Sequence, residues 1–418
     1  MSAYPVILVA VPVEHISPTE VVFAKAWSGC SPQHIPSCKG AFHDVASTTV
    51  YRGYAGPKLF TCNPSLLQRC DCCNHERPCY DSCGDRHCPK CQSLARAEWV
   101  EKRTSEVLPT HYFHVVFTIP EPIAAIAYHN KDLVYGMLFR ATAATLSTIA
   151  ADPQHLGAEI GFFAILHSWG QNLFFHPHLH CVVPGGGISL DGSRWISCRP
   201  NFFLPVKVLS RLFRRLFLKY LQEAFDAGKL QFFSLLESLQ DPQAFTRHLD
   251  LVRDVEWVVY AKPPFAGPQQ VVDYVGRYTH RVAISNHRIV DIEDGQVKFK
   301  WRDYRDNNQQ KTMPLTADEF IRRFLLHVLP SGFHRIRYYG FLGNRHRKEK
   351  LEQCRQLLGM ASPKGGSAEP TIQEDYRDRY ERLTGRSLRE CPVCHRGRMI
   401  AVKVLPQVRS SPTIQDTS

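Results

Sequence analysis

Hydrophobic and polar positions alternate in a way that predicts strands and helices between residues 106 and 300. Short apolar runs rich in β-branched and aromatic residues predict strands at YFHVVFTI, GFFAIL, HLHCVV, VEWVVYA and VKFKWRDY. Longer segments with helical periodicity lie between them, KDLVYGMLFRATAATLSTIA and VKVLSRLFRRLFLKYLQEAF. Strands mixed with helices in this way predict an α+β fold.

The flanking regions differ from this core in composition. Residues 1–50 show weak periodicity and form an extension to which we assign no role, whereas residues 51–105 are rich in Cys and turn residues and end in the helical run SLARAEWVEKR. A basic stretch follows the core at 306–360. Residues 361–418 hold a linker (ASPKGGSAEPT), a charged helix (IQEDYRDRYERL), a Cys pair and a flexible tail. We therefore expect five segments: 1–50, 51–105, 106–305, 306–360 and 361–418.

Composition describes an ordinary globular protein of 418 residues, with 44% hydrophobic and 22% charged residues. Lys and Arg number 51 against 39 Asp and Glu, a net charge of +12 that favours a polyanionic partner such as nucleic acid. The apolar run at 5–13 is too short to span a bilayer, so we expect no membrane segment and a cytoplasmic location. No GxxxxGK[ST] loop is present, and we expect no nucleotide cofactor.

Fifteen cysteines in a chain expected in the cytosol indicate metal binding rather than disulfides, and eight of them lie between residues 62 and 91. Two CxxC pairs separated by fourteen residues can offer four thiolates to one tetrahedral Zn²⁺. We expect the ligands Cys70, Cys73, Cys88 and Cys91, with Cys83 and His87 as possible replacements. Free buried cysteines and a redox CxxC are the alternatives. Residues 51–105 are thus predicted to form a small zinc-ribbon-like domain.

A further pair, Cys391 and Cys394, is followed by His395 in the pattern CxxCH. This is formally the attachment pattern of a c-type haem, but haem attachment requires export. The segment CPVCHRGRM resembles half of a zinc ribbon more closely, and its spacing does not identify the other ligands. An exposed thiol pair is the alternative.

The segment HPHLHCVV places His178 and His180 two residues apart on a predicted strand, so that both side chains share one face. Two imidazoles on adjacent positions can bind one metal ion, while Leu179, Cys181 and Val183 would pack on the core. Gln171 is close in sequence and could add an oxygen ligand, which would favour a harder ion. An exposed His cluster or His residues satisfied in a core are the alternatives.

A predicted helix begins near Pro268 in GPQQVVDYVGRYTHRVAIS. Tyr274 and Tyr278 are four residues apart and therefore lie on one helical face. Arg277 and Arg281, close to them in sequence, are candidate DNA-binding residues. Paired tyrosines on a helix are commonly packing residues. A phenolate can also attack a phosphodiester and store the bond as phosphotyrosine, and a metal held by two His can polarise the phosphate, so that strand transfer needs no nucleotide.

The stretch 320–350 contains eight Lys or Arg residues and one acidic residue, interleaved with aromatics. Such a pattern suits contacts to DNA phosphates with stacked bases. The candidate DNA-binding residues here are Arg335, Arg337, Arg345 and Arg347. A solvated basic face is the ordinary alternative.

These segments together resemble the rolling-circle insertion-sequence transposases of the IS91 type, which belong to the HUH endonuclease superfamily. The resemblance covers about residues 60 to 400 and rests on YFHVVFTIP, HSWGQNLFFHPHLHCVVPGGG, YVGRYTHRVAISN and FIRRFLLHVLPSGFHRIRYYGFLGNRHRKEKL. The family's zinc signature NSCxxRHCPKCQ appears as DSCGDRHCPKCQ, whereas the first 45 or so residues have no counterpart and Cys72 and Cys79 are additional.

The resemblance implies an antiparallel palm sheet that holds His178 and His180, with Mg²⁺ or Mn²⁺ as the catalytic ion and Zn²⁺ as the structural one. It also implies that Tyr274 and Tyr278 are nucleophiles that nick and join single-stranded element ends through 5′-phosphotyrosine links, and that double-stranded DNA is bound at ends or target. A rolling-circle replication initiator or relaxase would share this chemistry. A non-catalytic zinc DNA-binding regulator would leave the His and Tyr motifs unused.

Overall fold

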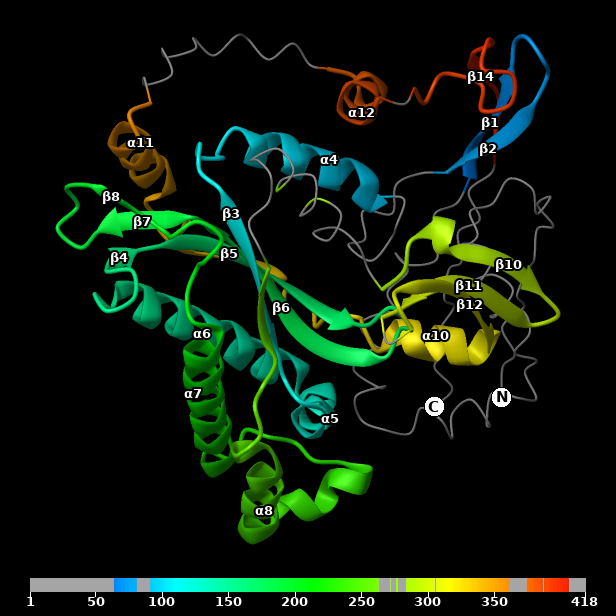
Figure 1. The fold of residues 1–418 in the computed structure, drawn as a ribbon. Helices are drawn as coiled ribbons and strands as arrows, with labels where there is room; N and C mark the ends of the chain where they lie inside the picture. Colours follow the sequence, from blue (N-terminus) through cyan, green and yellow to red (C-terminus); the bar gives the residue numbers. More distant parts are fainter. Residues whose placement is uncertain are drawn as a thin grey trace, which may run out of the picture.

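The computed structural model describes residues 64–80, 91–262, 271, 276, 283–304, 306–360, 374–385 and 387–405. A five-stranded antiparallel sheet in the order β13-β5-β6-β3-β9 lies at its centre (Figure 1). Its strands are β3 (Tyr112–Thr118), β5 (Gly161–Trp169), β6 (Phe175–Pro184), β9 (Val259–Lys262) and β13 (Ile336–Gly340). Because β6 lies between β5 and β3, its side chains are held from both sides.

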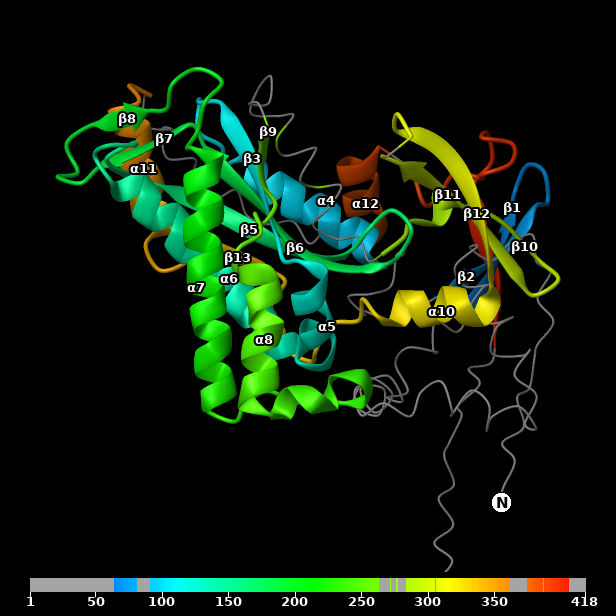
Figure 2. The ribbon, with the colours of Figure 1, turned by 60° about the horizontal axis from the view of Figure 1, so that its bottom comes forward.

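Four helices cover one face of this sheet, with α7 and α8 projecting away from it (Figures 1 and 2). They are α5 (Glu121–His129), α6 (Lys131–Ala151), α7 (Val206–Asp226) and α8 (Pro242–Arg253), with the 3₁₀ helix η2 (Ser234–Gln240) before α8. The largest buried apolar cluster joins them to the inward residues of the strands. Alternation along β6 contributes Leu179, Cys181 and Val183 to this cluster, all fully buried.

Among the described helices, α6 alone is long and apolar enough to cross a bilayer. Its apolar stretch is 61% buried, and the helix packs against α5, α7 and the central sheet. A core helix of a globular protein has these same properties, so the length and composition of α6 give no argument for a membrane span.

The opposite face of the sheet is covered by α4 (Cys91–Thr104) and α11 (Arg347–Leu357). A second buried cluster fills this side with Phe163 and Ile165 of β5 and Val182 of β6. Phe341, Leu351 and Val271 also belong to the cluster, and Trp99 of α4 packs against it. The two faces of one sheet therefore support two separate apolar layers.

Three smaller sheets surround this centre. The strands β4 (Ala158–Glu159), β7 (Gly186–Ser189) and β8 (Trp195–Ser197) form the first, and the second holds β10 (Ile289–Glu293), β11 (Gln296–Asp303) and β12 (Gln309–Thr316), which follow η3 (Asn286–Arg288) and pack on α10 (Ala317–Leu325). The third sheet combines β1 (Pro64–Cys70) and β2 (Glu76–Tyr80) with β14 (Met399–Val404), which follows α12 (Tyr376–Thr384). Its strands thus come from opposite ends of the described chain.

The expectation of mixed helices and antiparallel sheets is confirmed, and the helices expected around 93–103, 131–150 and 206–225 are present. The strand expected at VEWVVYA is shorter in the structure, because its pairing with β3 begins only at Val259. The preceding Trp257 instead turns toward α8, where its indole nitrogen donates to the Val252 carbonyl. Two strands pair with strands from other segments of the expected five. The strand β13, from the basic region, pairs with β5, and β14, from the last segment, pairs with β1.

Candidate functional site

The strand β6 presents His178 and His180 on the sheet face opposite α5 to α8, as the alternation predicts. Their imidazoles face each other, with the two Nε2 atoms 3.0 Å apart. Pro177 carries no amide hydrogen and lies where the register between β5 and β6 shifts, so the ladder loses no regular bond there. The two imidazoles are thus fixed on the central strand of the sheet.

A third histidine joins this pair from the neighbouring strand. His167 of β5 stands directly opposite His178 in the strand register, and its ring centroid lies 4.3 Å from that of His180. One nitrogen from each of His167, His178 and His180 lies within 4.8 Å of the others. Local spacing in the sequence does not identify His167, because only the register between β5 and β6 aligns it with the pair.

Desolvation keeps the imidazoles of His178 and His180 neutral. Desolvation lowers the pKa of His178 to about 4 and holds the pKa of His180 well below its ordinary value. The Nδ1–H of His178 donates to the His176 carbonyl at 2.6 Å, and Nδ1 of His180 lies 2.7 Å from Nε2 of the buried His114. With protons on both Nδ1 atoms, each Nε2 keeps a lone pair for a metal ion, which is how metal-binding histidines are commonly oriented.

Gln171, the expected oxygen ligand, lies in the turn after β5. Its side-chain amide nitrogen donates to the Tyr304 hydroxyl at 3.3 Å, and its backbone carbonyl accepts a bond from Arg288. The position beside the His pair is held by His167. A role for Gln171 in metal binding stays a prediction.

The expected nucleophiles Tyr274 and Tyr278 lie outside the described residues, as do Arg277 and Arg281. Two residues of their helix are described, and both are helical. Val271 is 2% exposed and belongs to the cluster on the face of β6 that also carries the histidines. A Cβ added to Gly276 would lie 2.5 Å from Cγ2 of Val100, so this helix approaches α4 closely at Gly276.

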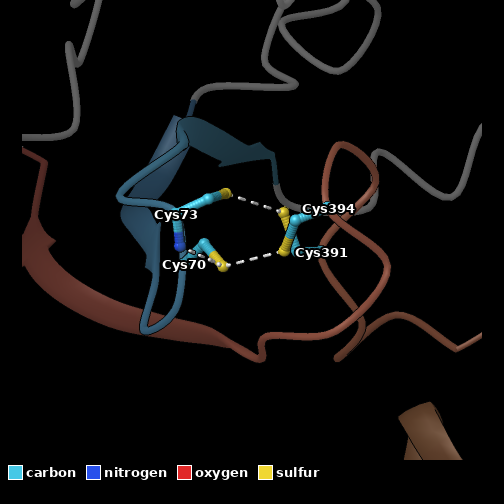
Figure 3. A group of neighbouring side chains, drawn as sticks. All are labelled: Cys70, Cys73, Cys391 and Cys394. Atoms are coloured by element: carbon cyan, nitrogen blue, oxygen red, sulfur yellow. Dashed lines mark hydrogen bonds between the residues drawn. The ribbon is translucent and has the colours of Figure 1, made fainter.

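Four cysteines form a second candidate metal centre, shown in Figure 3. The structure places Cys70 and Cys73 with Cys391 and Cys394, and one sulfur from each lies within 4.8 Å of the others. Backbone amides of Arg396 and Gly397 lower the pKa of Cys394 to about 6, which favours a thiolate.

The spacing of the sequence pointed instead to Cys88 and Cys91 as the partners of Cys70 and Cys73. Cys88 lies outside the described residues, as do Cys83 and His87, and Cys91 is the first residue of α4. The pair Cys391 and Cys394, whose partners the sequence did not identify, occupies that place.

Two of the four arginines expected to contact DNA in the stretch 320–350 make intramolecular contacts. The guanidinium of Arg337 lies over the rings of Phe139 and Phe333, at 4.4 and 5.0 Å from their centroids. The guanidinium of Arg347 lies 4.0 Å from the Tyr338 ring centroid and donates to the Leu342 carbonyl. Both side chains therefore stabilise the fold around β13.

The other two arginines of this set differ in exposure. Arg345 is exposed in the turn before α11, and Arg335 is half-buried next to β13. Contact of any of the four with DNA stays a prediction, and Arg345 is the most accessible of them.

Comparison with protein families gives two matches. A model described as "Putative transposase" matches residues 161–350, which include all three histidines and β13. A model described as "Transposase zinc-binding domain" matches residues 61–119, which include Cys70 and Cys73 and end before Cys391.

Two relatives extend these matches along the chain. "Putative transposase y4qJ" of Sinorhizobium fredii is 68% identical over 352 residues, which cover 84% of this chain and 88% of the relative. "Transposase for insertion sequence element IS801" of Pseudomonas savastanoi pv. phaseolicola is 27% identical over 332 residues, 78% of this chain and 77% of the relative.

Proposed function

This chain belongs to the insertion-sequence transposases of the IS91 type, and we propose that it nicks and joins single-stranded element ends through 5′-phosphotyrosine links. Transposases act on DNA, and the net charge of +12 suits that partner. The observation that carries the proposal is the group of His167, His178 and His180 on one sheet face. We propose the five-stranded sheet as the palm of an HUH endonuclease, with His178 and His180 as its histidine pair.

The proposed nucleophiles are Tyr274 and Tyr278. Val271 packs on the sheet face that carries the histidines. Tyr274 and Tyr278 follow Val271 by three and seven residues, and helical spacing predicts that all three share one helical face. A helix docked in this way would direct both hydroxyls toward the histidines.

The proposed reaction is a transesterification at phosphorus. The hydroxyl of one tyrosine loses its proton and attacks the scissile phosphate, forming the Tyr O–P bond. The bond from phosphorus to the 3′ oxygen breaks, and this oxygen takes up a proton to become a free 3′-hydroxyl. The 5′-phosphate stays on the protein, and the second tyrosine permits a second transfer before the first link is released. Arg277 and Arg281 of the same helix would bind neighbouring phosphates.

The three imidazoles are a donor set for a divalent transition metal. When bound, the ion would polarise the scissile phosphate and stabilise its developing charge. Nitrogen ligands suit Mn²⁺ better than Mg²⁺, which prefers oxygen ligands. We therefore propose Mn²⁺ as the more effective of the two ions expected from the sequence. Zn²⁺ has a separate, structural role in the region of Cys70 and Cys73.

Family membership favours a transposase over a replication initiator or a relaxase. A non-catalytic DNA-binding regulator is distinguished by cleavage, because such a protein would bind element ends without cutting them. The three imidazoles argue for catalysis, since nothing in a regulator requires them together on one face of the central sheet.

The test is cleavage of labelled single-stranded element ends by purified protein in Mn²⁺ or Mg²⁺. We expect His178→Ala and His180→Ala to lose cleavage while DNA binding is kept, because the core on the other face of β6 is untouched. His155→Ala is the matched control. Because His155 is exposed in the turn after α6, this variant should cleave normally. Full cleavage by both β6 variants would remove the basis of the proposal.

A further inference from the structure

The two CxxC pairs at opposite ends of the described chain lie face to face (Figure 3). The backbone explains why. The strand β1 pairs with β2 on one side and with β14 on the other, and Cys70 stands opposite Met399 in the β1–β14 register. The turn that follows β1 carries Cys70 and Cys73, and the turn that precedes β14 carries Cys391 and Cys394. Strand pairing therefore brings the two turns together.

The sulfur positions match a tetrahedral zinc site. The Sγ atoms of Cys70 and Cys394 are 3.7 Å apart, and those of Cys73 and Cys391 are 3.6 Å apart. Four sulfurs around a Zn²⁺ with Zn–S bonds of about 2.3 Å stand about 3.8 Å from one another. A disulfide would need about 2.05 Å, and all four cysteines are free thiols. The arrangement is that of a metal site.

The two turns have the same backbone geometry. The amide of Asn74 donates to the Cys70 carbonyl at 3.2 Å, and the amide of His395 donates to the Cys391 carbonyl at 3.1 Å. Asn74 and His395, each directly after its CxxC, both adopt the left-handed conformation, with φ of 58° and 53°. Two equivalent turns thus present two sulfurs each toward a common centre.

Backbone amides also support the sulfurs as thiolates. The amides of Cys72 and Cys73 lie 3.3 and 3.4 Å from the Cys70 sulfur, and the Gly397 amide lies 3.4 Å from the Cys394 sulfur. Gly397 is required there, because a Cβ would collide with the Cys70 sulfur. N–H donors around metal-bound sulfur stabilise its negative charge.

Besides the pairing of β1 with β14, the described residues give the C-terminal segment few buried apolar contacts. The buried apolar cluster around the sulfurs consists of Cys70, Cys391 and Met399, which is far too small a core to fold by itself. Contacts of α12 with α4 are exposed ion pairs, Arg379 with Glu98 and Arg382 with Glu101, and such pairs contribute little. A bound metal would therefore add to the stability that the β1–β14 pairing gives this contact between the ends.

We propose that Cys70, Cys73, Cys391 and Cys394 bind one structural Zn²⁺ that fastens the C-terminal segment 374–405 to the zinc-binding region at the start of the described chain. The zinc-binding domain is then discontinuous, with half of one ligand set about 320 residues after the other half. This inference does not depend on the tyrosine chemistry proposed above.

The first test is zinc content in purified full-length protein. The double variant Cys391→Ser and Cys394→Ser should contain one Zn²⁺ fewer per chain than the unaltered protein. The variant Cys72→Ser should keep its zinc, because the exposed Cys72 thiol lies in the same turn but outside the group. Unchanged zinc in the double variant would overturn the proposal and return the site to Cys88 and Cys91.

A second test needs no cysteine substitution, and it therefore decides the question even if the double variant fails to fold. A specific protease site is inserted between α11 and α12 in the otherwise unaltered chain, which is then cut. We expect the fragment that begins near residue 374 to co-elute with the rest while zinc is bound, and to separate after chelation that metal analysis verifies. Separation with zinc bound, or association after its removal, would contradict a zinc fastening.

Discussion

Replacing Gly276 with Ala tests how the predicted helix that carries Tyr274 and Tyr278 is positioned against α4. A Cβ at this site would lie 2.5 Å from Cγ2 of Val100, whereas carbon atoms in contact are about 3.5 to 4.0 Å apart. The helix or α4 must therefore move by about 1 Å, since a valine side chain is stiff and cannot turn aside cheaply. Gly276 lies between Tyr274 and Tyr278 in the sequence, so the displacement would act next to the two proposed nucleophiles.

Two opposing terms set the effect on stability. Overpacking costs about 1 to 3 kcal/mol, and Ala in place of Gly inside a helix returns about 0.5 to 1 kcal/mol. We expect a net loss of about 0 to 2.5 kcal/mol in the free energy of unfolding, which leaves the protein folded. The reaction should suffer more, because a misplacement of 1 Å can slow a positioned reaction about 100-fold.

The assay is the single-turnover rate of covalent adduct formation with single-stranded element ends, measured beside a urea unfolding curve. Val100→Ala removes the methyl group that Cβ would meet, and the double variant Gly276→Ala with Val100→Ala should recover most of the rate. Val100→Ala alone is the control. A rate within twofold of normal for Gly276→Ala, or no recovery in the double variant, would refute this account of helix docking.

Two further predictions concern the histidines. His167→Ala should reduce Mn²⁺-dependent cleavage at least about 10-fold through weaker metal binding, whereas Gln171→Ala should change it little, and a metal titration of cleavage that ranks them oppositely would restore Gln171 as the ligand. His327 is 1% exposed, and its burial lowers its pKa to about 3. Below about pH 6.5 the unfolded chain therefore binds a proton at His327 that the folded chain does not bind, and the free energy of unfolding falls as the pH falls from there toward 3. The variant His327→Gln should therefore lose stability less steeply over this range, by up to about 1.4 kcal/mol per pH unit in urea unfolding, and an unchanged slope would contradict the assignment.

Local patterns predicted much of the fold. The apolar runs gave β3, β5, β6 and β11, and the helical segments gave α4, α6 and α7. Alternation along β6 placed His178 and His180 on one face and Leu179 on the other, because successive side chains of a strand point to opposite faces of the sheet. Features determined by a repeat of two or 3.6 residues could be derived from the sequence.

Features that depend on pairing between distant strands could not. His167 and Gln171 lie four residues apart in one segment, and only the register of β5 against β6 sets His167 opposite His178. The partners of Cys70 show the same limit. A nearby CxxC is favoured by the smaller entropy of closing a short loop, whereas the pairing of β1 with β14 brings a distant one to Cys70.

The central claim, that this transposase forms phosphotyrosine links through Tyr274 and Tyr278, is tested most directly by adduct mapping. Labelled single-stranded element ends are incubated in Mn²⁺ with Tyr274→Phe, Tyr278→Phe and the double variant, whose phenyl rings keep the packing and lose only the hydroxyl. Adducts that resist denaturation are then assigned by peptide mass. We predict an adduct on the remaining tyrosine in each single variant, impaired transposition by both, and no adduct in the double variant. An adduct that persists in the double variant would place the nucleophile elsewhere and contradict the claim.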